Sequence, residues 1–387
     1  MHFIKKLMRI LIVLIGVSLL SFILANLSTV DPAEALARRI YSNPTQEQIQ
    51  EMYDGQKENE IYTFVRNPYY NRGESDVDVF HVKVIPDNDA KVLALRNGEI
   101  DMIVGQANLT YNTFEELSAA PGFTAIASDA TIQSRTMGFK VSHAPFNDPA
   151  IRLAANYAID TQSISTNIFF RVETPADSVL DKELPYCDVN TGAYQYDVKK
   201  AKQILEDAGW TDSDGDGIRE KDGVKLSGNL LYATDQASLG DLSSVLAAQL
   251  KEVGFDITLV GKEQMVYFQD ISNGDFDLAI AITNAIPSDP YLLISRCLTN
   301  TVIDNYLAQG LAGMENADEL INSLNAMTNE DEIQSVYNTL LQELHDEAAI
   351  IPLTRVKGMA AYNTDIISGY EFYHQPDYTD VSAIVMK

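Results

Sequence analysis

This chain has few cysteines and few basic residues. The cysteines among its 387 residues are Cys187 and Cys297, too few for a disulfide scaffold or a thiolate metal site. They either form one bridge or stay as two buried free thiols. Lys and Arg total 28 against 55 Asp and Glu, which gives a net charge of −27. Because such a chain repels phosphate backbones, we do not expect it to bind nucleic acid.

Signatures of catalysis and of metal binding are also missing. The five histidines are scattered, and no two of them have the helical spacing of a metal site. We expect His345 to be a structural hydrogen-bonding residue rather than a ligand. The sequence contains no Ser-His-Asp ordering, Gly-rich phosphate loop or zinc signature. It therefore predicts a protein that is not an enzyme and has no certain cofactor.

One apolar run is long enough to cross a membrane. Ile10–Leu27 has eighteen residues without a charge and would extend roughly 27 Å as a helix. Lys5, Lys6 and Arg9 precede it, which favours a cytoplasmic N-terminus. The run is long for a signal peptide and its exit is a poor cleavage site, so we predict an uncleaved single-pass anchor. The acidic body would then lie outside the cytoplasm at the cell membrane.

The body of the chain alternates strand and helix patterns. Helix-start signals occur at Asp148, Asp197 and Asn329. Asp241–Gly254 has apolar residues three and four positions apart, as an amphipathic helix does. Phe255–Val260 and Phe276–Ile282 are short apolar runs that suit buried strands, and closing strands are expected at Ile350–Val356 and Met359–Tyr362. These features predict an α/β fold.

An acidic loop follows the helix that starts near Asp197. Acidic side chains occupy positions 1, 3, 5 and 9 of a calcium-loop pattern: Asp212, Asp214, Asp216 and Glu220. Position 12, where such loops carry a bidentate glutamate, is Gly223. The pattern predicts either a weak calcium site or a polar hairpin that binds no metal.

The N-terminal residues 1–55 resemble the start of dipeptide/nickel-type ABC importer permeases. In that family the first transmembrane helix runs into an Asp-Pro-Ala turn and then a Thr-x-Glu-Gln-Ile helix. Asp31-Pro32-Ala33 and Thr45-Gln46-Glu47-Gln48-Ile49 have the same order. No later segment is apolar for eighteen residues, so the chain is not itself expected to form a channel.

Four motifs in residues 56–387 carry a second resemblance. FVRNPYY, VKVIPDNDAKVLALRNGEIDMI, FNDPAIRLAANYAID and YDVKKAKQILEDAGW, in this order, resemble family 5 extracellular solute-binding proteins. The resemblance implies a type II periplasmic-binding-protein-like α/β fold whose two lobes close over a ligand. It also implies delivery of that ligand to ABC importer permease subunits. Family members carry a longer stretch before the first motif, so we expect a complete second lobe and a truncated first lobe.

Within the family, the chain is most similar to nickel or nickel-chelate receptors. Peptide receptors usually place an acid a few residues before an Asp-Pro pair, but residues 284–288 read NAIPS. Some nickel receptors place a histidine about a dozen residues after the pair, and residues 291–310 contain none. Nickel-chelate binding is therefore the first hypothesis. A peptide receptor, or a fusion remnant that binds no ligand, is the alternative.

The predicted ligand contacts flank Asp289-Pro290, where a buried strand ends. Loops at the carboxyl ends of strands commonly contact ligands in α/β sheets. The candidate residues are Asn284, Ser288, Asp289, Tyr291 and Arg296. Arg296 would meet a carboxylate of a chelating ligand, and Asn284 and Ser288 would supply hydrogen bonds. The alternative is that Asp289 only caps the next helix.

Overall fold

A computed structural model of the chain describes residues 61–67, 75–85, 87–105, 108–283, 289–301, 305–373, 376 and 379–387. The predicted membrane segment 10–27 and the permease-like residues 1–55 lie outside these ranges, and so do Asn284 and Ser288. None of the helices within the described ranges combines the length and the apolar character needed to cross a membrane.

The chain forms two compact units, residues 1–86 and residues 87–387. The described part of unit 1 is an antiparallel pair of strands, β1 (Ile61–Val65) and β2 (Val79–Lys83). Unit 2 contains the main sheet, and all sites discussed below lie within it. The predicted domain boundary near residue 55 lies outside the described residues.

Unit 2 is built on a seven-stranded sheet of order β3-β11-β4-β10-β8-β9, with β5 paired to β11. The strands are β3 (Met102–Val104), β4 (Phe123–Phe139), β5 (Thr174–Pro175), β8 (Ser227–Ala233), β9 (Asp256–Lys262), β10 (Leu278–Ile282) and β11 (Ile350–Asn363). β10, β8 and β9 are parallel, whereas β4 and β11 pair antiparallel with their neighbours. Helices connect the parallel strands, so the predicted α/β fold is confirmed.

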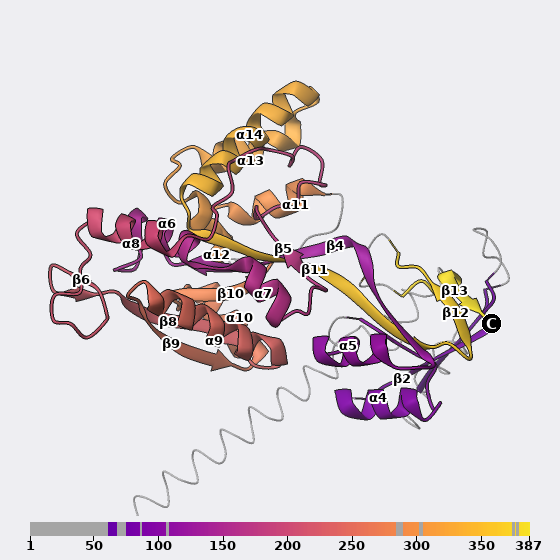
Figure 1. Cartoon of the computed structure of the whole chain (residues 1–387). Coiled ribbons are helices and arrows are strands. Elements are labelled where there is room, and N and C mark those ends of the chain that lie inside the picture. Colours follow the sequence, from indigo (N-terminus) through magenta and orange to yellow (C-terminus); the bar gives the residue numbers. More distant parts are fainter. Residues whose placement is uncertain are drawn as a thin grey trace, which may run out of the picture. The chain divides into compact units, whose positions relative to one another are not determined.

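The two longest strands divide unit 2 into a small half and a large half (Figure 1). β4 and β11 pair from Phe123 opposite Asn363 to Gly138 opposite Ile350, with register shifts between Pro352 and Met359. The small half contains β3, α4 (Asn88–Arg96), α5 (Tyr111–Ala119), β12 (Ile367–Tyr370) and β13 (Ile384–Met386). The large half contains β8, β9, β10 and the remaining helices. The two strands predicted at Ile350–Val356 and Met359–Tyr362 are one continuous strand, which corrects that expectation.

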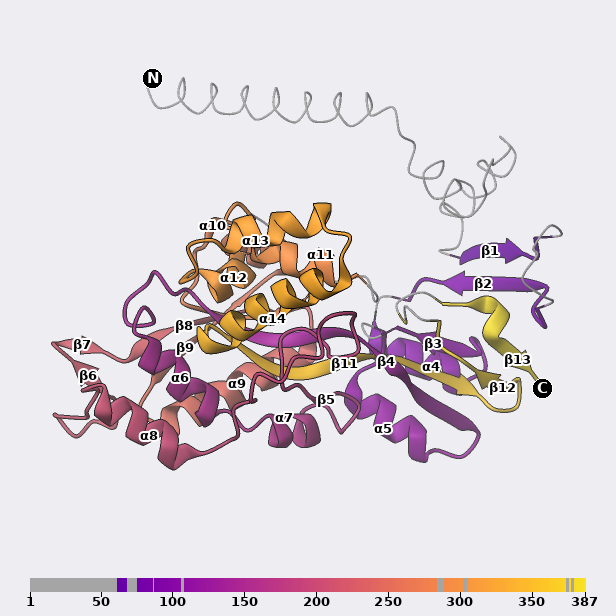
Figure 2. The same cartoon turned by 90° about the horizontal axis from the view of Figure 1, so that it is seen from above.

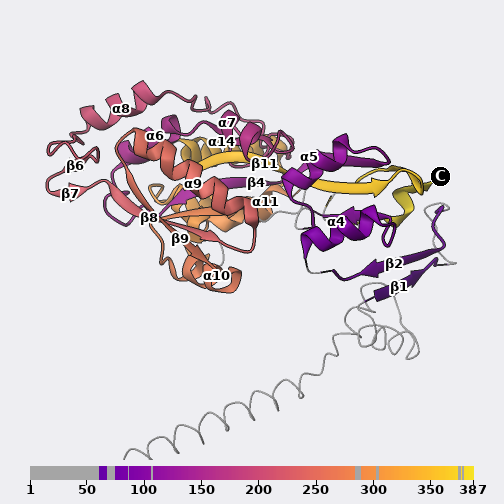
Figure 3. The same ribbon diagram turned by 60° about the horizontal axis from the view of Figure 1, so that its bottom comes forward.

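Helices cover both faces of the sheet in the large half (Figures 2 and 3). α6 (Pro149–Ala158) and α9 (Ala237–Glu252) lie on one face, and α10 (Gln264–Asn273) and α12 (Asn305–Ala308) lie on the other. α9 buries a stripe at helical spacing: Leu239, Leu242, Leu246 and Leu250. β10 is an apolar run that is almost wholly buried, as expected for a strand covered on both faces.

Three helices of unit 2 begin where the sequence predicts. The capping side chains are Asp148 of α6, Asp197 of α8 (Val198–Asp207) and Asn329 of α14 (Glu330–Asp346). Each accepts a hydrogen bond from a backbone N–H of the first helical turn, which satisfies a donor that the helix leaves unpaired. These caps fix the entry of the chain into the helices around the sites described next.

Candidate functional site

The predicted ligand loop is only partly described. Asp289 caps α11 (Pro290–Ile294), because its side chain accepts a hydrogen bond from the N–H of Leu292 at 3.2 Å. Asp289 therefore acts as a helix cap, and its contact with a ligand stays a prediction. Tyr291 lies in the same helix, and its hydroxyl accepts a hydrogen bond from the Asn325 amide. Arg296 follows in a 3-10 turn and is half-buried. The structure thus brings Asp289, Tyr291 and Arg296 onto one short segment, and their binding role stays a prediction.

A buried charged cluster lies where the two halves of unit 2 meet, and the sequence pattern did not predict it. Arg135 of β4 and Glu173, which precedes β5, are both 0% exposed. Arg135 Nη2 lies 2.7 Å from Glu173 Oε1, and Nε lies 3.1 Å from Oε2. The hydroxyls of Tyr111 and Thr354 donate to the same carboxylate. The cluster therefore joins α5 of the small half to both long strands.

The electrostatics of this cluster depend on the Glu173 carboxylate. Burial alone would lower the pKa of Arg135, but the charges of Glu173 and Tyr111 and the hydrogen bonds to both together outweigh burial and raise the pKa above its ordinary value. The guanidinium also lies over the Phe169 ring, 4.8 Å from its centroid. Arg135 Nη1 has no hydrogen-bond partner among the described residues. The one sequence signal for the cluster was a charged residue inside the mostly uncharged run TIQSRTMGF.

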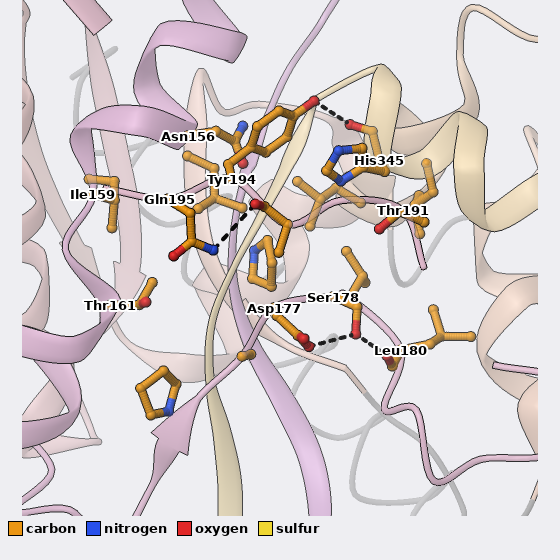
Figure 4. Close-up of a pocket in the computed structure, with 18 of the residues that line it drawn as sticks. Asn156, Ile159, Thr161, Asp177, Ser178, Leu180, Thr191, Tyr194, Gln195 and His345 are labelled. Carbon is orange, nitrogen blue, oxygen red and sulfur yellow. Dashed lines mark hydrogen bonds between the residues drawn. The ribbon is translucent and has the colours of Figure 1, made fainter. Parts of the chain in front are cut away.

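A cavity of about 270 Å³ lies in the large half of unit 2 (Figure 4). Its walls come from the α6–α7 junction, residues 175–180 and 189–196, the end of α14 and the start of β11; α7 is Thr161–Asn167. His345 stacks on Tyr194, with ring centroids 4.2 Å apart, and the Tyr194 hydroxyl donates to the His345 carbonyl at 3.2 Å. None of the predicted ligand residues that the structure describes lines this cavity.

The acidic loop has features of both predicted structures, the weak calcium site and the polar hairpin. Carboxylate oxygens of Asp212, Asp214 and Asp216 lie within 4.8 Å of one another. The Lys225 ammonium pairs with Asp216 and lies 3.6 Å from Asp214, so the chain supplies its own cation. Glu220 does not join this group, because its Oε1 accepts from the N–H of Ser213 at 2.8 Å. The expected hairpin is present as β6 (Glu220–Lys221) and β7 (Val224–Lys225).

Cys187 and Cys297 are both buried and form no disulfide bond with each other. Burial raises the pKa of Cys187 to about 12. Its thiolate is therefore not formed at neutral pH, and this thiol is unreactive.

The chain matches the family model of bacterial extracellular solute-binding proteins, family 5 (middle), over residues 52–305. It belongs to this family. The nickel-binding periplasmic protein of Escherichia coli K12 is 29% identical over 311 residues, which cover 80% of this chain and 59% of that protein. The oligopeptide-binding protein AppA of Bacillus subtilis is 30% identical over 229 residues, 58% of this chain and 41% of that protein.

A solved structure has the same fold as this chain. The crystal structure of NikA from Brucella suis with Fe(III)-EDTA is 27% identical and gives a TM-score of 0.79, covering 86% of this chain and 66% of that chain. The predicted periplasmic-binding-protein-like α/β fold is confirmed. The family consists of solute-binding proteins, consistent with the prediction that the chain is not an enzyme. The chain spans about 59% of the length of the nickel-binding relative.

Proposed function

We propose that the chain is the solute-binding component of an ABC importer and captures nickel as a chelate. The observation that carries this proposal is the similarity to NikA of Brucella suis, which holds a metal chelate in its crystal structure. The nickel-binding relative of E. coli supports the same solute class. We place the ligand between two lobes joined by β4 and β11, because lobes that close around a ligand bury it on both sides.

The sequence before Asp289 favours a chelate over a peptide. A peptide ligand carries an ammonium group, and residues 284–288 (NAIPS) contain no acid to pair with it. A buried charge without a partner costs several kcal/mol, on the order of 3–5. Arg296, in contrast, would suit a carboxylate of a chelating molecule such as an amino acid.

Peptide binding is the second candidate function. The AppA relative is an oligopeptide-binding protein with 30% identity over 229 residues. The ammonium of a peptide would then pair with an acidic residue outside the segment around Asp289-Pro290.

The proposed location follows from the family and from the N-terminus. We place the body outside the cytoplasm, next to permease subunits, and held by a membrane helix over residues 10–27. Protease added to intact cells should remove the body, and a protected body would refute this orientation.

Isothermal titration of the full chain in detergent tests the ligand. The titrants are nickel chloride, nickel with L-histidine, and a dipeptide. We expect heat of binding from nickel-histidine alone. Binding of the dipeptide alone would favour the second candidate. If no titrant binds, the chain does not have the proposed function.

A further inference from the structure

Two side chains of the cavity beside Tyr194, Asn156 and His345, offer it hydrogen-bond acceptors. Asn156 is 6% exposed, and both N–H groups of its amide are occupied by the carbonyls of Arg152 and Ala348, each at 3.0 Å. The Asn156 amide oxygen accepts no hydrogen bond from any described residue. This buried side chain therefore offers the cavity an acceptor and no free donor.

His345 adds a second acceptor. Its ring nitrogens make no hydrogen bond to a described residue. Burial lowers the pKa of His345, so the imidazole is neutral at pH 7 and keeps one lone pair free. Stacking on Tyr194 fixes the plane of the ring.

The lining contains two carboxylates. Asp160 and Asp177 line the cavity, and among its described lining residues there is no Lys or Arg. Asp177 is half-exposed at the rim, where it pairs with the ammonium of Lys182 and has the Arg355 guanidinium 3.8 Å from its other oxygen. Figure 4 places Asn156 and His345 on one side of the cavity and Asp177 on the other. Aliphatic side chains such as Leu341, Leu344 and Ile351 line the space as well.

We propose that this cavity binds a small aliphatic diamine in its doubly protonated form. One ammonium donates to Asn156 and His345, with the carboxylate of Asp160 in the same lining as its counter-ion, and the other donates to Asp177, while the methylene chain contacts the aliphatic wall. The volume of about 270 Å³ is just below the usual range of ligand pockets, about 300–1,000 Å³, which limits the ligand to a short chain. The site does not use Asp289, Tyr291 or Arg296, so it is independent of the proposed nickel site.

Titration of the full chain with 1,4-diaminobutane tests this proposal, with butane-1,4-diol as the uncharged analogue. We expect saturable binding of the diamine and none of the diol. Asp177→Asn should weaken diamine binding by about tenfold or more. Asp181→Asn is the matched control, because Asp181 lies 3.6 Å from the same Arg355 that Asp177 approaches at 3.8 Å but does not line the cavity. The control should bind within about twofold of wild type.

A second variant keeps the test decisive if Asp177→Asn lowers the melting temperature. His345→Phe retains a ring for Tyr194 and removes the acceptor nitrogen, so it should also weaken diamine binding by about tenfold. The proposal fails if 1,4-diaminobutane does not bind at about 10 mM, or if the diol binds equally well. It also fails if Asp177→Asn and Asp181→Asn weaken binding to the same extent.

Discussion

Arg135 and Glu173 form a two-point ion pair inside unit 2, at N–O distances of 2.7 and 3.1 Å, with neither side chain exposed to solvent. Planar guanidinium and carboxylate groups match in this geometry, which makes the hydrogen bonds strong and directional. The pair lies where β4 passes from the small half to the large half. Its chief effect is expected when one partner is lost, because the other would then be a buried charge without a counter-ion.

Glu173→Gln should strongly destabilise the protein. The variant leaves Arg135 buried without its counter-ion, so the free energy of unfolding should fall by about 3–5 kcal/mol. Urea unfolding followed by circular dichroism measures this change. Glu116→Gln is the control, because Glu116 is exposed and lies 3.7 Å from Arg96; it should cost less than about 1 kcal/mol. Equal losses for the two variants would contradict a structural role for the buried pair.

Asp148 should make stability fall in acid. Burial favours its neutral form, but hydrogen bonds from Trp210, the N–H of Ala150 and Lys221 outweigh burial and hold the pKa of Asp148 below 3.8. Because the folded pKa is lower than the unfolded one, the stabilisation is complete above about pH 4 and is lost as pH falls through the folded pKa. Asp148→Asn keeps the helix cap and should lose less stability than wild type between about pH 5 and pH 2.5.

Urea unfolding at several pH values measures this difference. Asp197→Asn serves as the control, since it replaces a carboxylate that caps α8 and pairs with no basic side chain in the described ranges. If Asp148→Asn loses as much stability in acid as wild type does, the hydrogen bonds to Asp148 do not contribute to acid sensitivity.

Calcium should stabilise the acidic loop only slightly. Lys225 already pairs with Asp216 and lies 3.6 Å from Asp214, and the position of the twelfth ligand is Gly223. A weak site gives little stabilisation at about 1 mM calcium, so the melting temperature should rise by no more than about 2 °C. Lys225→Met should increase the response to calcium, whereas Lys251→Met should not. A rise of about 10 °C in the wild type would mean that the loop is a tight site.

Arg296 should affect chelate binding more than stability. Arg296→Ala removes the proposed carboxylate contact, so binding of nickel-histidine should fall by about tenfold or more. The melting temperature should change little, because Arg296 is only half-buried. Arg96→Ala, at the exposed end of α4, is the control and should bind as wild type. A wild-type affinity for Arg296→Ala would remove this residue from the site.

Local patterns in the sequence were sufficient for many elements of the large half. Helix caps act over three or four residues, so Asp148, Asp197 and Asn329 could be identified without tertiary information. The apolar run of β10 likewise indicates a strand with two covered faces. α9, however, begins at Ala237 rather than near Asp241. Its N-terminus has no capping side chain, so no local pattern marks this start.

Features that depend on distant partners could not be predicted in this way. β4 mixes polar and apolar residues because it serves both halves of unit 2, so it has no regular alternation. Arg135 is buried because it pairs with Glu173, and Glu173 lies 38 positions away in the chain. The predicted break between Val356 and Met359 reflects register shifts within one strand. The cavity is assembled from separate segments, and no single segment carries a signal for it.

The pairing of β4 with β11 also constrains the order of folding. β4 has β10 along one edge and β11 along the other, and these partners come from much later in the chain. During synthesis, β4 therefore has an open edge until residues 350–363 have been made. Such edges promote aggregation, and contacts between distant residues slow folding. The sheet can therefore close only after β11 has been synthesised.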